Sequence, residues 1–144
     1  MKKKILLKQF FIILFLTGTM ESIIAGIMPF ISSEYQVSDS ITGQLTTIYT
    51  GIFAIFGPIL VFSLRKYQSK LIYLLSLVLF GISNLLVYSG GPLLILFLSR
   101  ILCALSASVV VAKTLEMCFH VFHNDKKKLA IVNMGFSASI ALGV

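Results

Sequence analysis

The sequence contains no tryptophan, only two cysteines and three prolines, and few charged side chains. Charged residues make up 12% of its 144 positions, whereas about 25% is usual for a soluble domain. Hydrophobic residues make up 58%, and the mean hydropathy is +1.00. This composition excludes an ordinary soluble domain and indicates an integral membrane protein with little mass outside the bilayer.

The sequence shows no arrangement of residues that is typical of a metal site or a catalytic site. Cys103 and Cys118 both lie within such stretches and provide neither a disulfide framework nor the spacing of a metal site. His120 and His123 have no companion ligands nearby, so we expect no metal and no other cofactor. Nucleotide-binding loops and nucleophile motifs are missing, and we expect no enzyme activity.

Five apolar runs are candidates for membrane-spanning helices. A helix needs about 20 apolar residues to cross a hydrocarbon core about 30 Å thick. The last run would reach only about 24 Å at the helical rise, short of a full crossing. The predicted fold class is therefore an all-α integral membrane protein, with four complete transmembrane helices and the start of a fifth. The runs cover residues 10–30, 41–64, 71–88, 93–117 and 129–144.

Polar links separate these runs. Residues 32–40 carry two acids and end in residues that favour helix capping. Residues 89–92, Ser-Gly-Gly-Pro, predict a tight turn whose proline opens the next helix. Residues 65–70 and 120–128 form two basic links.

The 12 Lys and Arg residues outnumber the 5 Asp and Glu residues, and most of them fall on alternate links. Because Lys and Arg gather on the cytoplasmic side of membrane proteins, the N-terminus is predicted to be cytoplasmic. A cleaved secretory signal would also begin with lysines, but the first apolar run is too long and contains an acid. Nucleic-acid contact is disfavoured, because lysines in loops of this kind are usually topology signals. The basic link residues are Lys2, Lys3, Lys4, Lys8, Arg65, Lys66, Lys70, Lys126, Lys127 and Lys128.

Small residues recur four positions apart along three of the runs. Because lipid is as apolar as leucine, membrane helices associate through close packing of small residues. We therefore expect the first, second and fourth helices to pack inside a bundle and the third, which is rich in Leu, Ile and Val, to face lipid. The small residues are Gly18, Ser22 and Gly26; Gly43, Thr47 and Gly51; and Ala104, Ser108 and Ala112, beside Ser99, Cys103 and Ala107.

Two charges of opposite sign lie deep in the apolar runs. At the helical rise, Glu21 lies about 13 Å from the outer end of its run and Arg100 about 12 Å from the outer end of its own. A charge at the bilayer centre costs at least ~2.5 kcal/mol, so it usually faces a cavity or a partner. We hypothesise that Glu21 and Arg100 share a polar cavity, as an ion pair or a proton-linked couple. A static pair that joins two helices is the alternative.

A second pair of charges lies near the inner end of the fourth run. Lys113 and Glu116 are three positions apart, which places them on one face of a helix. A long lysine side chain near a helix end can reach the membrane surface with its ammonium. We therefore predict an interfacial ion pair with a snorkelling lysine.

Several segments, in order, resemble the major facilitator superfamily of transporters. The closest likeness is to its drug:proton antiporter branch, which includes sugar-efflux permeases. Residues 26–34 (GIMPFISSE) and 43–49 (GQLTTIY) are similar to the first two helices of that branch. Residues 100–104 (RILCA) resemble its fourth-helix motif, and residues 142–144 resemble the start of its fifth-helix antiporter motif.

The resemblance implies roles for individual residues. In that branch an acid precedes the proline near the end of the first helix, which here gives Glu21 before Pro29. Helices one and four both line the central cavity of the family, which supports a shared site for Glu21 and Arg100. Gln44 and Tyr49 match the second-helix motif. The resemblance thus predicts a substrate and proton pathway with Glu21, Arg100, Tyr49 and Gln44.

The link between the second and third helices departs from the family pattern. That pattern has Gly and then Asp-Arg-x-Gly-Arg-Arg. Here Arg65 stands at the Asp, Lys66 at the Arg, and Lys70 keeps the last base. These three residues are assigned to the cytoplasmic gate loop, without the acid of the usual charge latch.

The family has a twelve-helix fold of two halves that work by alternating access. The resemblance therefore implies the N-terminal fragment of a proton-coupled exporter for a small sugar-like or drug-like solute, in the inner membrane of a bacterium. Its partners would be solute, protons, the lipid bilayer and the missing half, with no nucleic acid. A complete small homo-oligomeric multidrug exporter and a non-transporting membrane interaction protein are the alternatives.

Overall fold

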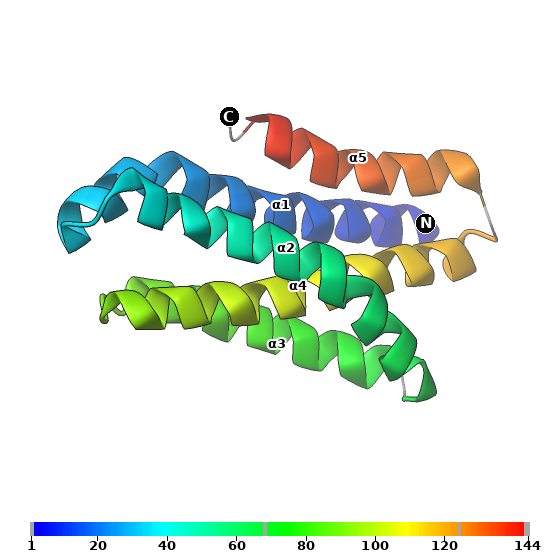
Figure 1. The fold of residues 1–144 in the computed structure, drawn as a ribbon. Coiled ribbons are helices and arrows are strands. Elements are labelled where there is room, and N and C mark those ends of the chain that lie inside the picture. Colours follow the sequence, from blue (N-terminus) through cyan, green and yellow to red (C-terminus); the bar gives the residue numbers. More distant parts are fainter. Residues whose placement is uncertain (1, 68, 124, 143–144) are drawn as a thin grey trace. The chain divides into compact units, whose positions relative to one another are not determined.

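The computed structural model describes residues 2–67, 69–123 and 125–142, without the side chains of Lys2, Val61, Arg65 and Ser69. In this described part all regular structure is helical, which confirms the predicted fold class (Figure 1). The helices are α1 (Lys2–Tyr35), α2 (Asp39–Ser63), the short 3-10 helix η1 (Leu64–Lys66), α3 (Ser69–Tyr88), α4 (Leu93–Val121) and α5 (Lys126–Leu142).

Four of the described helices, α1 to α4, are long and apolar enough to cross a membrane. The fifth, α5, has 17 residues and is the shorter element that the sequence predicted. Both α1 and α4 extend beyond the predicted runs, to Lys2 at one end and to Val121 at the other. No glycine or proline interrupts these extensions, so the backbone hydrogen bonds continue past the apolar segment.

The end of α1 differs from the prediction of a link over residues 32–40. The helix continues to Tyr35, and Pro29 lies inside it. It stops where Gln36 adopts a φ of +50°, and the N–H of Val37 donates to the carbonyl of Ser32 at 3.1 Å. This hydrogen bond satisfies one of the last carbonyls of the helix, as in a Schellman cap.

Two other predicted turns can be compared with the structure. Gly90 has a φ of +65°, which confirms the tight turn before α4 and explains why glycine is suited to that position. The capping role expected at the start of α2 is wrong, because the side chain of Ser38 makes no capping hydrogen bond. In contrast, the Asp125 side chain caps α5 by accepting hydrogen bonds from the N–H groups of Lys127 and Lys128.

The chain divides into two compact units, and the first contains residues Met1–Ile27 and Lys113–Val144. In this unit α1 and α5 run side by side (Figure 1). The Ser22 hydroxyl donates across the seam to the carbonyl of Ser139 at 3.2 Å. A Cβ added at Gly135 would lie 2.8 Å from the carbonyl oxygen of Phe11. Small residues on both helices therefore allow a close approach of their backbones.

The second unit contains residues Met28–Ala112. Its core forms around Tyr49 of α2 and a strip of small residues on α4. The Tyr35 hydroxyl at the end of α1 donates to the carbonyl of Gly91 at 2.7 Å. This bond joins two turns that lie far apart in the sequence.

Burial differs strongly between the spanning helices. In the most apolar segment of each helix, 56% of the α4 residues are buried, but only 22% of the α3 residues and 17% of the α2 residues. The exposed α3 agrees with the expectation that it faces lipid. The second helix packs against α4 through Tyr49. A Cβ added at Gly43 or Gly51 of α2 would meet no described atom within 4 Å, so this face of the helix is open.

Candidate substrate pathway

The candidate site centres on a buried arginine in the second unit. Arg100 of α4 is only 1% exposed. Its guanidinium carbon lies 4.4 Å from the centroid of the Tyr49 ring, within the range of a cation–π interaction. An interaction of this kind is worth about 2 kcal/mol or more when it is desolvated, as it is here. The deep position predicted for Arg100 therefore coincides with a buried cation held against an aromatic face.

Small residues on α4 make room for this contact. Tyr49 packs in one cluster with Cys103, Ala104 and Ala107, all of which are almost fully buried. The Tyr49 ring stacks on that of Phe53 at a centroid distance of 6.1 Å. The strip on α4 predicted to pack closely is thus buried, and its partner is an aromatic side chain of α2.

Polar groups of α2 and α3 border this cluster. Asn84 of α3 donates to the carbonyl of Phe80 at 2.6 Å and contacts the Cys103 sulfur at 3.8 Å. On α2, the buried hydroxyl of Thr46 has no hydrogen-bond partner within the described part of the chain. Thr46 is one turn before Tyr49, so the two share a face of the helix. Neither Asn84 nor Thr46 was assigned a role from the sequence, because a single Asn or Thr in an apolar run carries no distinctive pattern.

The other predicted pathway residues have different environments. Glu21 of α1 is half-buried and belongs to the first unit, whereas Arg100 belongs to the second. Their shared cavity therefore stays a prediction. Gln44 is exposed on α2, one to two turns before Tyr49. Tyr49 and Arg100 are the two predicted residues that direct contact brings together.

The predicted gate residues lie around η1 and the start of α3. Lys66 and Lys70 are exposed. The side chain of Arg65 lies outside the described residues. The two described lysines extend from the ends of their helices, where solvent or lipid headgroups can reach them.

The ion pair predicted near the end of α4 is present, but its environment differs from the prediction. The Lys113 ammonium lies 2.8 Å from a carboxylate oxygen of Glu116. The Lys113 side chain is 1% exposed, whereas that of Glu116 is 38% exposed. The prediction of a snorkelling lysine is therefore wrong, because the ammonium is enclosed by protein and the acid reaches the surface.

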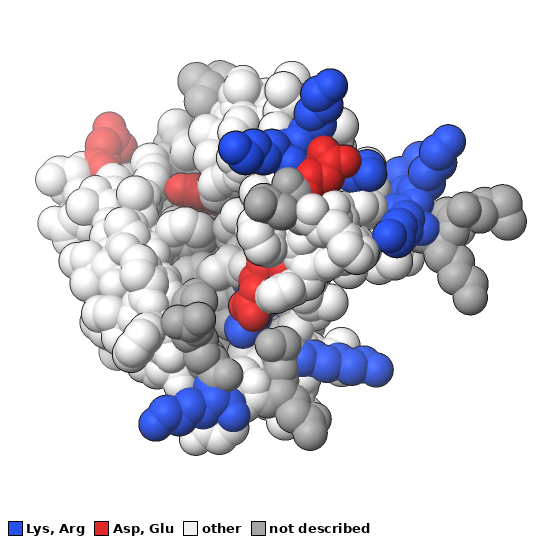
Figure 2. All heavy atoms as spheres, turned by 90° about the vertical axis from the view of Figure 1, so that its right-hand side faces the viewer, with Lys and Arg blue, Asp and Glu red and all other residues white. Residues whose placement is uncertain are grey.

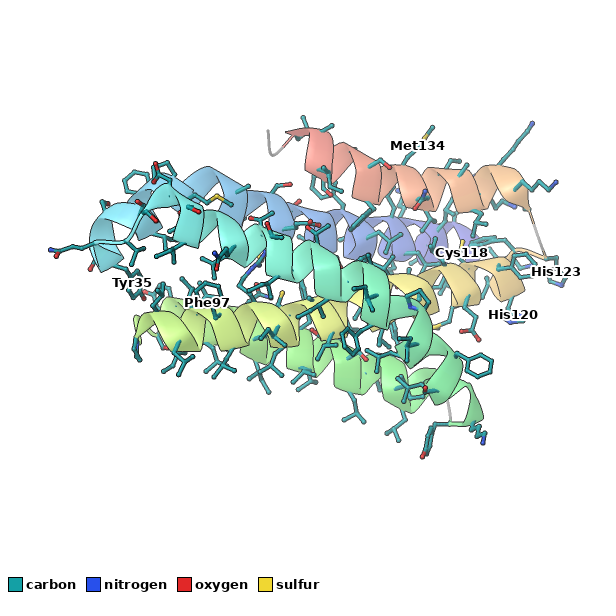
Figure 3. The ribbon with its side chains drawn as sticks, viewed as in Figure 1. Tyr35, Phe97, Cys118, His120, His123 and Met134 are labelled. Atoms are coloured by element: carbon teal, nitrogen blue, oxygen red, sulfur yellow. The ribbon has the colours of Figure 1, made fainter. Side chains whose placement is uncertain are left out.

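The two histidines near the far end of α4 have no such enclosure. His120, at the end of α4, and His123, just after it, are both exposed, although Cys118 and Phe122 beside them are buried (Figure 3). His123 adopts a φ of +53° and follows the end of the helix. Among the described residues, no group of three or more His, Cys, Asp or Glu side chains could hold a metal ion.

Comparison with known proteins identifies related sequences. The sequence model of the Major Facilitator Superfamily matches residues 10–144. The chain is 32% identical over 92% of its length to an uncharacterized MFS-type transporter, YbcL, of Bacillus subtilis (strain 168). It is 27% identical over 89% of its length to a probable sugar efflux transporter of Pasteurella multocida (strain Pm70).

These matches cover only part of each relative. The chain spans 35% of the Bacillus subtilis protein and 32% of the Pasteurella multocida protein. No solved structure matches the chain significantly.

Proposed function

This chain belongs to the major facilitator superfamily, and we propose that it supplies part of the solute pathway of an exporter that works by alternating access. With four helices of spanning length, it is a multi-pass membrane protein. The observation that carries the proposal is the contact between buried Arg100 and the face of Tyr49. A charge kept inside apolar helices at a cost to stability is typical of a functional site.

Arg100 and Tyr49 are the proposed solute contacts. An aromatic ring offers an apolar face to a sugar ring or a drug, and a guanidinium donates several hydrogen bonds in a fixed plane. The unsatisfied Thr46 hydroxyl on the same face of α2 offers a further hydrogen bond. We therefore propose a small sugar-like or drug-like solute, which is consistent with the printed name of the Pasteurella multocida relative.

Glu21 is the proposed proton carrier. An ionised carboxylate and a guanidinium attract each other strongly away from water, and protonation of the acid removes that attraction. In this proposal ionised Glu21 holds Arg100 in the orientation that binds the solute, a proton on Glu21 removes that attraction and favours solute release, and loss of the proton restores solute binding. The exporter would thus exchange solute for protons, with Gln44 at the edge of the same pathway.

The basic links support a cytoplasmic N-terminus in the inner membrane of a bacterium. With this orientation Arg65, Lys66 and Lys70 would belong to a cytoplasmic gate. The rest of the pathway would come from the remaining helices of a full-length transporter, because the chain spans about a third of its relatives. Alternatively, other copies of this chain in a homo-oligomer would supply the rest of the pathway.

A chimera tests this function directly. Residues 10–144 would replace the matching segment of the Bacillus subtilis relative, and export of a panel of sugars and cationic dyes would be measured in inverted vesicles. Arg100→Leu should reduce export about thirtyfold, because about 2 kcal/mol of cation–π and polar contact is lost. Tyr49→Phe should retain most activity, whereas Tyr49→Leu should not.

The response of export to the pH gradient tests the proton step separately from solute binding. Glu21→Gln should leave solute binding measurable while export no longer responds to the pH gradient. Thr47→Val is the matched control on the open face of α2, since the Thr47 side chain is exposed and its hydroxyl bonds within its own helix. Equal export by the Arg100→Leu chimera and the unaltered chimera would disprove the pathway. An unchanged pH response in Glu21→Gln would disprove proton coupling.

A further inference from the structure

The contact of Arg100 with Tyr49 depends on how α4 is held at that level. Lys and Arg side chains project from the surface viewed in Figure 2, where water or lipid headgroups can reach them. Arg100 is instead 1% exposed, and its guanidinium carbon lies 4.4 Å from the centroid of the Tyr49 ring. The contact requires α4 to keep its rotation beside α2. Residues that fix this rotation therefore affect the proposed solute site.

Asn84 is a half-buried polar residue in α3, a helix apolar enough to cross a membrane. A side-chain amide in such a helix costs free energy unless its polar atoms find partners. The amide nitrogen carries two N–H groups, and two acceptors are near it. It lies 2.6 Å from the carbonyl oxygen of Phe80 on the same helix and 3.8 Å from the sulfur of Cys103 on α4. Asn84 thus joins α3 to α4.

The Phe80 carbonyl decides which way this amide faces. If the amide were turned over, its own oxygen would lie against the carbonyl oxygen, and two acceptors repel each other. The nitrogen therefore faces Phe80, which leaves its second N–H directed at the Cys103 sulfur. The direction of the contact with α4 is thus fixed by a strong hydrogen bond within α3.

Cys103 connects this contact to the proposed solute site. It packs in one cluster with Tyr49, and Phe80 packs against the same cluster. Arg100 is three positions before Cys103, so the two residues share a face of α4. A rotation of α4 about its axis would therefore move the sulfur away from Asn84 and, at the same time, the guanidinium away from the Tyr49 ring.

We propose that Asn84 is a positioning residue of the solute site, which fixes the rotation of α4 through Cys103 and so holds Arg100 against Tyr49. This role rests on the solute pathway proposed above. The amide acts through α4 and does not contact the solute. All the residues involved belong to the second unit.

Transport kinetics of the chimera described above test this role. Asn84→Leu removes the amide and keeps a side chain of similar size. It should raise the KM for export about threefold, the effect of losing one average hydrogen bond between membrane helices, with little change in kcat. A residue with only a structural role would lower the amount of active transporter and leave KM as it is. An unchanged KM in Asn84→Leu would overturn the proposal.

The sulfur side of the contact provides matched variants. Cys103→Ala should raise KM as much as Asn84→Leu, and the double variant should raise it no further, because both changes remove one contact. Cys103→Ser keeps an acceptor and should retain the KM of the unaltered chimera. Cys118→Ala is the control, since Cys118 is also a buried free cysteine of α4 but belongs to the first unit. Additive effects in the double variant, or equal rises in the two alanine variants, would contradict the role.

Infrared spectroscopy tests the contact without any solute. In the 144-residue chain with Cys118→Ala, Cys103 is the one remaining thiol. Its S–H stretching band should shift when Asn84→Leu removes the amide, and a band that does not move would overturn the contact.

The two proposals fail in different ways. Reduced export by Arg100→Leu together with an unchanged KM in Asn84→Leu would reject the positioning role alone. Full export by Arg100→Leu would reject the solute pathway itself.

Discussion

The small-residue stripes of α1 and α2 have the same spacing but different surroundings. On α1, a Cβ at Gly18 would overlap the Ser139 hydroxyl, and Ser22 donates a hydrogen bond to the carbonyl of Ser139. On α2, a Cβ at Gly43 or Gly51 would meet no described atom within 4 Å. One stripe forms a seam with another helix, and the other lies on an open face.

The spacing of small residues on a helix is therefore not enough to locate a helix–helix contact. Small residues four apart permit the close approach of a second backbone, but they do not identify it. α2 makes its close approach elsewhere, at Gly57, where an added Cβ would lie 3.2 Å from the Cβ of Ser108 on α4. Gly57 was not part of the predicted stripe. The position of a glycine relative to a neighbouring helix, rather than its periodicity, decides whether it is needed.

The largest effect is expected at the α1–α5 seam. Gly135→Val should destabilise the first unit by about 1–3 kcal/mol, because the new side chain meets the Phe11 carbonyl, which cannot move alone. Gly43→Val on the open stripe is the matched control and should leave stability almost unchanged. Thermal unfolding in detergent, followed by circular dichroism, measures both. Equal losses in the two variants would show that the stripes do not differ.

A smaller effect is expected within α2 itself. Gly57→Val should destabilise the second unit by about 1 kcal/mol, since the Ser108 Cβ must shift by a few tenths of an ångström. Gly51→Val lies on the same helix but on its open face, so it controls for the change in helix propensity. The same unfolding measurement applies. A loss in Gly51→Val as large as that in Gly57→Val would contradict the assignment of the packed face.

Much of this fold follows from the pattern of apolar residues. The runs predicted all four spanning helices and the shorter fifth, because uninterrupted apolar length is the main requirement for crossing a bilayer. The depth of Arg100 in its run indicated a special environment, and its partner Tyr49 was named through the family resemblance. Which side chain meets the guanidinium depends on the rotation of α2 against α4, and no periodicity encodes that rotation.

Other parts of the candidate site could not be predicted for related reasons. The sequence placed Lys113 and Glu116 on one face, but the burial of the lysine depends on elements that surround α4. The lack of a hydrogen-bond partner for the Thr46 hydroxyl could not be predicted either, because it also depends on the surrounding elements. Threonine itself is common on membrane helices. Helix ends were also uncertain, because Ser32 to Tyr35 are polar and still helical.

The hydrogen bond across the α1–α5 seam provides a weaker test. Ser22→Ala removes the bond to the Ser139 carbonyl and should cost about 0.6 kcal/mol, the average for hydrogen bonds between membrane helices. Thr47→Val is the matched change on α2, where the hydroxyl donates only to Gly43 of its own helix. We expect little effect from it. A double-mutant cycle with Gly135→Val would show whether the bond depends on the close approach of the helices.

The smallest effect is expected at the helix starts, where α5 and α2 differ in side-chain capping. The side-chain hydrogen bond from Lys128 holds the pKa of Asp125 below its ordinary value, helped by the backbone N–H groups of Lys128 and Lys127 and by the lysine charge. Because the folded pKa is lowered, the stabilising effect of this carboxylate is present above the unfolded pKa. It is lost as the pH falls through the lowered value.

Acidification from about pH 5 to about pH 2 should therefore fray the first turn of α5. Amide hydrogen exchange at Leu129 and the residues after it would measure the fraying, corrected for the intrinsic pH dependence of exchange. In Asp125→Asn the acid-dependent change should disappear, since an asparagine still caps the helix but does not titrate. Ser38→Ala at the start of α2 should leave exchange there unchanged, because that serine makes no capping bond. Acid fraying that persists in Asp125→Asn would assign the pH dependence to another group.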